Sequence, residues 1–152
     1  METLAFEIAL RYTHFISILL ITGALAAEWI LMKPELTRSE LKRLSRIDAI
    51  YGVAAVLVVT AGLMLWLLGV SKPETYYTHN WVFLTKIGIF ITVGTLSVFP
   101  TVFFIKRQKG RPEEVVPVPA WIRRCISLEL LLLAAIPLCA SLMARGYGYI
   151  GN

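Results

Sequence analysis

The sequence contains little charge for its length. Only 16% of its 152 residues are charged, whereas 57% are hydrophobic, and the mean hydropathy is +0.70. An ordinary soluble domain has about a quarter of its residues charged, so this composition excludes that class and indicates an integral membrane protein. The net charge is +5, but the basic residues cluster between apolar runs, where they orient membrane helices. We therefore expect the lipid bilayer as a partner and no nucleic acid.

Motifs that carry chemistry are also scarce. The sequence has no glycine-rich phosphate loop, no nucleophile elbow and no paired-cysteine metal motif, so nucleotide-dependent and hydrolase functions have no support. Its two cysteines, Cys125 and Cys139, fall in one expected helix, about 21 Å apart along the axis. This separation excludes a disulfide between them.

Four apolar segments reach the length of about 20 residues that a membrane-spanning helix needs. Because the linkers are short, neighbouring helices should pack antiparallel. We predict an all-α fold with a single domain over residues 1–152: a four-helix transmembrane bundle with spans at 4–32, 48–70, 81–105 and 122–144. The run Ala24-Leu25-Ala26 resembles a signal-peptidase site, but charges interrupt the preceding segment, so we expect the first helix to be retained.

Basic residues on alternate linkers predict the orientation. Most of them lie in the first and third linkers, so the positive-inside rule places both termini outside a bacterial-type inner (plasma) membrane. In the first linker, Thr37 to Glu40 precedes an amphipathic pattern, which predicts a short helix along the membrane surface that runs into the second span. Three prolines in residues 110–119 predict a loop.

Other residues in the spans have structural explanations. Small residues, including Gly52, Gly62, Gly88 and Gly94, should let helix backbones approach closely. Pro100 and Pro137 should bend the third and fourth helices. Tryptophans near the span ends should anchor the protein at the membrane interface: Trp29, Trp66, Trp81 and Trp121.

The first span carries four ionisable residues, Glu7, Arg11, His14 and Glu28. At about 100° per residue they fall within roughly a third of the helix circumference. An ionisable group in hydrocarbon costs at least about 2.5 kcal/mol, so this stripe should face protein, a cofactor or water. We interpret it as the functional face.

His14 has two interpretations. It is either a buried histidine that bonds to another helix or titrates in a polar cavity, or a metal ligand, since neutral imidazole binds iron, copper or zinc. A haem site would further need cations for the propionates and a second ligand or an open position. Arg11 and Lys86 suit the propionates, and Met64 or Met143 is the candidate second ligand.

Glu28 and Glu129 lie toward the inner side in this topology. They either form a proton route or pair with basic residues at the span ends, namely Arg43, Arg46, Arg123 and Arg124. Asp48 falls at the same depth. Spacing alone leaves both alternatives open.

Scattered positions along nearly the whole chain resemble the HemJ-type protoporphyrinogen IX oxidase family and related CopD-like proteins: Arg11-Tyr-Thr-His14-Phe-Ile-Ser17, Arg43-Leu-Ser-Arg46, Trp81, Lys86 and Glu129. The resemblance implies a four-helix membrane bundle. It also implies that His14 binds haem b and that Lys86 is functionally required.

The sequence departs from that family at three places. Arg11 replaces the usual lysine, Glu28-Trp29 replaces a Leu-Pro-Arg motif, and Ser97 to Pro100 replaces a stretch with glycine and histidine. These differences indicate a sister family of unknown function.

The leading hypothesis is a membrane b-haem protein with an electron-transfer role, with His14 as the iron ligand. Arg11, Lys86 and Met64 would help to bind the cofactor, and Lys86 and Glu129 would be catalytic. A quinone or porphyrin-like substrate and a homo-oligomer are the expected partners. The alternative is a non-enzymatic protein whose polar face lines an ion, proton or metal pathway or an assembly interface.

Overall fold

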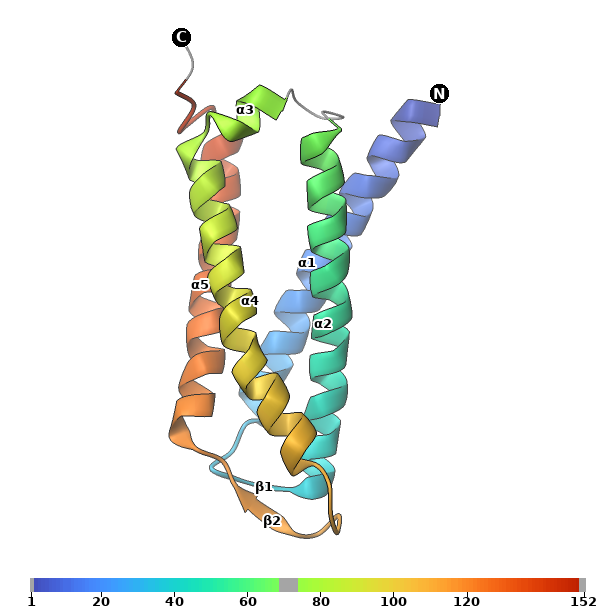
Figure 1. Cartoon of the computed structure of the whole chain (residues 1–152), viewed down its shortest axis with the longest axis vertical. Coiled ribbons are helices and arrows are strands. Elements are labelled where there is room, and N and C mark those ends of the chain that lie inside the picture. Colours follow the sequence, from blue (N-terminus) through green and yellow to red (C-terminus); the bar gives the residue numbers. More distant parts are fainter. Residues whose placement is uncertain (1, 69–73, 151–152) are drawn as a thin grey trace.

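Four long helices form the body of the molecule (Figure 1). The structure, a computed structural model, describes residues 2–68 and 74–150. Each long helix has the length and hydropathy to cross a membrane. The elements in chain order are α1 (Glu2–Leu31), β1 (Glu35–Thr37), α2 (Arg38–Leu67), α3 (Glu74–Thr78), α4 (Trp81–Arg107), β2 (Val115–Pro117) and α5 (Ala120–Ala144).

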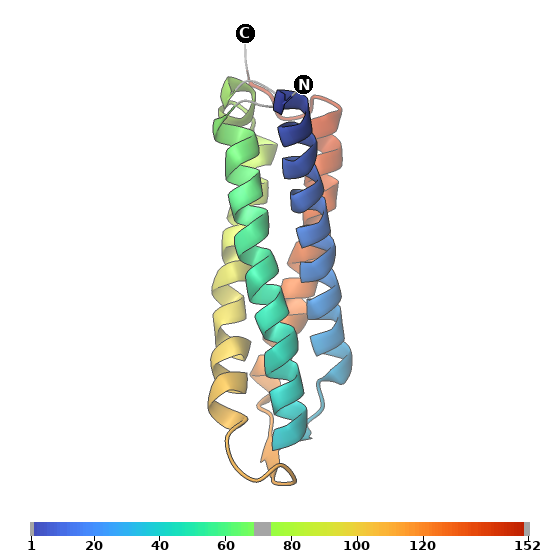
Figure 2. The same cartoon turned by 90° about the vertical axis from the view of Figure 1, so that its right-hand side faces the viewer.

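The helices pack as two antiparallel pairs. The closest packing joins α1 to α2 and α4 to α5, with fewer contacts from α1 to α5 and from α2 to α4. Both chain ends lie at one end of the bundle, here called the terminal end, and the two strands lie at the other, the strand end (Figures 1 and 2). The prediction of an all-α antiparallel four-helix bundle is confirmed.

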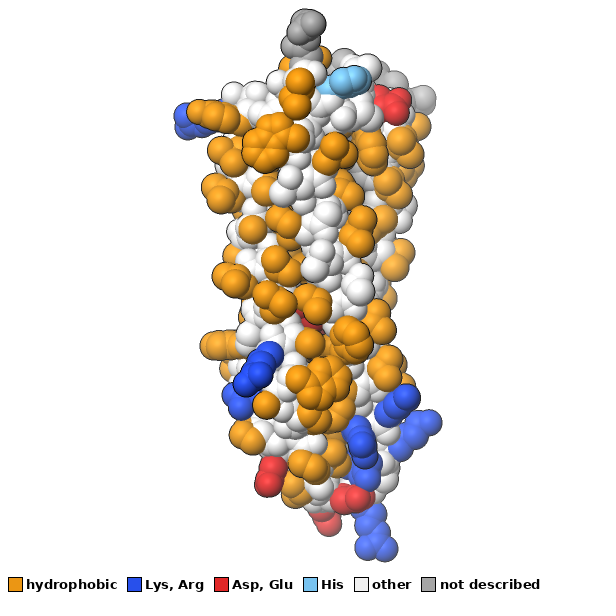
Figure 3. All heavy atoms as spheres, turned by 60° about the vertical axis from the view of Figure 1, so that its left-hand side comes forward, with side chains coloured by type: hydrophobic (Ala, Val, Ile, Leu, Met, Phe, Trp, Pro, Cys, Tyr) orange, Lys and Arg blue, Asp and Glu red, His pale blue; other side chains and the backbone are white. Residues whose placement is uncertain are grey.

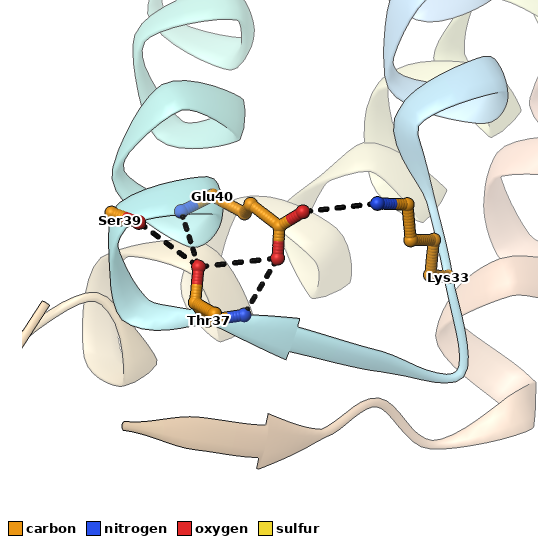
Figure 4. Close-up of polar contacts among 4 residues, drawn as sticks. All are labelled: Lys33, Thr37, Ser39 and Glu40. Atoms are coloured by element: carbon orange, nitrogen blue, oxygen red, sulfur yellow. Dashed lines mark hydrogen bonds and ion pairs between the residues drawn. The ribbon is translucent and has the colours of Figure 1, made fainter. Parts of the chain in front are cut away.

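The second helix begins before the predicted span at 48–70. It starts at Arg38 and runs unbroken to Leu67, so the helix expected in the first linker does continue into the second span, as predicted. Thr37 caps it: the Thr37 hydroxyl accepts from the Glu40 amide, and the Glu40 carboxylate accepts from the Thr37 amide (Figure 4). Lys33 extends this contact with a 3.0 Å ion pair to Glu40. A well-capped start lets α2 continue beyond the apolar span.

The first and third linkers pair with each other. β1 and β2 form a two-stranded antiparallel sheet in which Leu36 is opposite Val116, and both of these side chains are buried. The sequence predicted only a loop at residues 110–119. Pairing of strands 80 residues apart leaves no local signal, because each strand has only three residues.

Large apolar side chains cover the outside of the bundle. Ile30 and Leu131 are 71% and 69% exposed, and Figure 3 shows hydrophobic side chains along the middle of the molecule with Lys and Arg mainly toward the strand end. This distribution suits a lipid-facing surface with charged ends. Trp29, Trp81 and Trp121 are exposed near helix ends, as anchors should be. Trp66 differs, because it is partly buried against Phe83, with ring centroids 5.0 Å apart.

Candidate functional site

Three carboxylates meet in the half of the bundle nearer the strand end. Glu28 on α1, Asp48 on α2 and Glu129 on α5 are 2%, 7% and 1% exposed. Glu28 and Glu129 are each close enough to Asp48, and to one another, for their charges to repel when ionised. We call these three residues the acidic cluster. Such groups are costly within a membrane and are therefore a mark of function.

The acidic cluster arises from ordinary helix periodicity. Residues three or four apart share a helix face, so an acid that follows a buried aliphatic residue by that spacing is itself directed to the interior. Each helix follows this rule: Leu25 precedes Glu28, Leu44 precedes Asp48 and Ile126 precedes Glu129. The core stripe of each helix therefore carries an acid at a position where an aliphatic side chain would be expected.

Half of the carboxylate oxygens in the acidic cluster are buried without a hydrogen-bond partner among the described residues. Oε1 of Glu28 and both oxygens of Glu129 are buried and accept no hydrogen bond within the part of the chain that the structure describes. Over residues 2–68 and 74–150 neither glutamate forms an ion pair, so the predicted alternative of pairing with basic residues at the span ends is wrong. Those arginines, Arg43, Arg46, Arg123 and Arg124, are exposed instead.

Asp48 has a partner and borders a cavity. Oδ1 of Asp48 accepts a 2.8 Å hydrogen bond from the hydroxyl of Thr101 on α4. The cavity, of about 390 Å³, lies between α2 and α4, and its polar lining includes Asp48, Thr101, Tyr51 and Ser97. Tyr51 is buried and interacts with Ser97. Asp48 is the member of the acidic cluster that lines this cavity.

The glycines that line the cavity leave space between the helices and do not bring them into close contact. A Cβ atom added at Gly52 or Gly94, which both line the cavity, would meet no atom within 4 Å. The same holds for Gly88, so the prediction of close helix approach is wrong for these three residues. Gly62 alone behaves as expected among the four, because a Cβ there would lie 3.2 Å from Cε1 of His14.

His14 joins α1 to α2 nearer the terminal end. Its Nδ1 lies 3.1 Å from the carbonyl oxygen of Val58, and its ring lies against Gly62. When Nδ1 carries the proton and donates it to that carbonyl, the lone pair is on Nε2, which is the arrangement found in metal-ligating histidines. The half-buried His14 thus makes the helix-to-helix contact of the first interpretation, and this contact leaves Nε2 unused for the second.

Of the two cations predicted to assist His14, Lys86 lies near it and Arg11 pairs with Glu7. Lys86 is half-buried, is near enough for its charge to act on His14 and Cys139, and has Nζ 5.4 Å from the ring centroid of Phe83. Arg11 is bound to Glu7 on its own helix by contacts of 2.7 and 2.8 Å. The predicted stripe on the first helix therefore divides into an ion pair of exposed Arg11 with half-buried Glu7, the half-buried His14 and the buried Glu28.

The two methionines lie apart from the imidazole. Met64 follows Gly62 by two residues, about 200° around α2, so its side chain leaves the helix on the side opposite the one that faces His14. Met143 is buried in an apolar cluster with Val82 and Phe83. Across residues 2–68 and 74–150, no group of three His, Cys, Asp or Glu side chains could hold a metal ion.

Sequence reasoning missed four residues of this site. Asp48 was placed at the right depth without a role, Ser97 was named only as a departure from the HemJ-type pattern, and Tyr51 and Thr101 were not considered. The available signal was the core periodicity of α2, on which Leu44, Asp48 and Tyr51 follow one another.

Comparison with known proteins identifies a family whose description names a membrane protein and no activity. A family described as "Predicted membrane protein (DUF2214)" matches residues 6–148. The chain belongs to this family. Searches of curated proteins and of solved structures found no match. The family agrees with the expectation of an uncharacterised membrane protein, and it brings no link to HemJ-type or CopD-like proteins.

Proposed function

We propose that this DUF2214 protein moves protons through the membrane and that the acidic cluster carries them. The observation behind the proposal is Glu129, whose two buried carboxylate oxygens accept no hydrogen bond from any described residue. A buried polar group without a partner costs about 1 to 3 kcal/mol in stability. A residue retained at that cost, facing two further carboxylates, is suited to exchanging protons.

The surroundings supply a route. The cavity between α2 and α4 has room for water beside Asp48, and Thr101 donates a hydrogen bond to that carboxylate. Protons then pass from Asp48 to Glu28 and Glu129, whose charges interact with it. His14 and Lys86 continue the series of ionisable groups toward the terminal end. Carboxylate and histidine chains of this kind are the usual proton relays of membrane proteins.

A transport assay in vesicles tests this function. The purified protein is placed in liposomes that enclose a pH-sensitive dye, and a potassium gradient with valinomycin supplies the driving force. We expect internal pH to change faster than in protein-free vesicles of the same lipid. Equal rates in the two preparations would contradict the proposal.

A second candidate function is electron transfer by haem b, and the His14 to Val58 contact favours it. His14 would hold the iron through Nε2, and Lys86 would neutralise an anionic group of the cofactor. Bound haem would supply reversible one-electron reduction. The visible spectrum of the purified protein tests this candidate, because haem ligation gives a Soret band that His14→Ala should remove or shift.

The two functions are compatible in one protein. Electron transfer to a lipid-soluble quinone or a porphyrin-like substrate consumes or releases protons, which the acidic cluster and Glu129 in particular would exchange. We further propose a location in a bacterial-type inner membrane with both termini outside, from the charge on alternate linkers. We also propose that the protein assembles as a homo-oligomer.

A further inference from the structure

A second cavity, of about 230 Å³, lies at the strand end between the first turns of α2 and the linker that follows α4. Four of the residues that line it are charged, and all four are basic: Arg38, Lys42, Arg43 and Arg46. The remaining lining residues are uncharged. The cavity therefore has a strongly positive wall and no acidic side chain in its lining.

Arg38 shapes this cavity, because its guanidinium is bound to the linker. Its guanidinium makes a bidentate pair with the carboxylate of Glu114, at 2.7 and 2.8 Å, and donates to the carbonyl oxygens of Arg107 and Lys109. Gly110 has a φ of +133°, and a Cβ there would lie 2.5 Å from Nε of Arg38, so glycine is required. These contacts fix the linker against α2 and neutralise the charge of Arg38.

The other three cations lack such partners. Lys42, Arg43 and Arg46 are exposed, and within the described part of the chain none of them forms an ion pair. Lys42 and Arg46 are four residues apart on one helix, where like charges destabilise the helix by about 0.2 to 0.5 kcal/mol. An anion held between them would remove that repulsion.

We propose that this cavity binds a phosphate group and that an anionic phospholipid supplies it. Arginine presents several N–H donors in a planar fork that matches phosphate oxygens, and lysine adds a compact charge. The cavity lies at the end of the bundle where basic residues gather, which is the level of the lipid headgroups in a spanning protein. This site is separate from the acidic cluster and independent of the function proposed for it.

Lipid titration of the full-length protein in non-ionic detergent, followed by native mass spectrometry, tests this inference. Phosphatidylglycerol and zwitterionic phosphatidylcholine are titrated separately against wild type and against Lys42→Gln/Arg43→Gln/Arg46→Gln. The matched control is Lys106→Gln/Arg123→Gln/Arg124→Gln, which removes the same charge at the same end outside the cavity. Arg46→Gln alone, with Arg123→Gln as its control, makes the same comparison with less effect on folding.

We expect the cavity variant to bind phosphatidylglycerol about tenfold more weakly than both the wild type and the control. Phosphatidylcholine should bind weakly to all three proteins. Inorganic phosphate should displace phosphatidylglycerol from the wild type and from the control variant, which both keep the cavity, and should not displace the lipid that remains bound to the cavity variant. Equal losses in the two triple variants, or equal binding of both lipids to wild type, would overturn the proposal.

Discussion

Thr101 on α4 donates a 2.8 Å hydrogen bond to Asp48 on α2, and this contact joins the two helical pairs at the wall of the larger cavity. Asp48 is buried, and Thr101 is the hydrogen-bond donor that the structure gives its carboxylate. The bond therefore holds the acid most accessible from the cavity in a defined position.

Loss of that donor should destabilise the bundle. Thr101→Val leaves a buried carboxylate without its hydrogen bond, which should lower the free energy of unfolding by about 1.5 to 3 kcal/mol. Thermal unfolding in detergent measures the change. Thr92→Val on the same helix is the control, because Thr92 is exposed and its hydroxyl donates to the carbonyl oxygen of Gly88 on its own helix. Equal shifts in the two variants would show that the contact with Asp48 has no stabilising effect.

Replacement of Glu129 should have the opposite effect on stability. Glu129→Leu removes a buried carboxylate that makes no hydrogen bond and fills the site with an apolar group, so the protein should gain about 1 to 3 kcal/mol. The unfolding midpoint in detergent should rise. Destabilisation by Glu129→Leu would mean that the carboxylate has a structural partner, which would contradict its assignment to proton exchange.

Gly62 should be intolerant of substitution because of His14. In Gly62→Ala the new Cβ would lie 3.2 Å from Cε1 of the imidazole, so the ring must move by a few tenths of an ångström, and its bond to Val58 resists that movement. Gly88→Ala is the matched control: its Cβ meets no atom within 4 Å, and alanine is favoured over glycine in a helix by about 0.8 to 1 kcal/mol. We expect Gly62→Ala to lower the unfolding midpoint and Gly88→Ala to maintain or raise it. The reverse order would refute the packing role of His14.

The ion pair between Arg38 and Glu114 should give a pH-dependent contribution to stability. The Arg38 guanidinium lowers the pKa of the Glu114 carboxyl below its ordinary value. Because the folded-state pKa is below the unfolded one, the stabilisation is complete above the ordinary pKa of glutamate and is lost as pH falls through the folded value. Glu114→Gln should therefore unfold at a lower temperature than wild type near neutral pH.

The difference between Glu114→Gln and wild type should shrink in acid, below the ordinary pKa of about 4.3. Glu113→Gln, at the neighbouring exposed position, should match wild type at every pH. A difference for Glu114→Gln that is independent of pH would show that the charge of Glu114 is not what stabilises the linker.

The fold was predictable where the bilayer dictates it. A span needs about 20 apolar residues, so the four long helices and their antiparallel order follow from hydropathy and short linkers. The capping-box spacing of Thr37 and Glu40 and the amphipathic pattern after it indicated that a helix begins in the first linker and continues into the second span, as α2 does. The pairing of β1 with β2 depends on residues far apart in the chain, so no local sequence pattern predicts it.

The depth of the acidic residues was predictable, whereas their contacts and the residues that line the cavity were not. Glu28, Asp48 and Glu129 are at the depth that the sequence indicated, but whether Glu28 and Glu129 reach an arginine depends on how each helix is rotated about its axis. The structure rotates Arg43 and Arg46 outward and the acids inward. The contact of His14 with Gly62 is likewise tertiary, since nothing in either helix alone specifies the facing residue.

Proton flux through Glu129 variants in dye-loaded vesicles tests the central claim most directly. Glu129→Gln keeps the size of the side chain and removes its exchangeable proton, and Glu113→Gln removes an exposed carboxylate in a linker as the control. We predict that flux falls by roughly tenfold or more in Glu129→Gln, because a positioned acid is lost. Flux in Glu113→Gln should equal that of wild type. Equal flux in wild type and in folded Glu129→Gln would contradict the account.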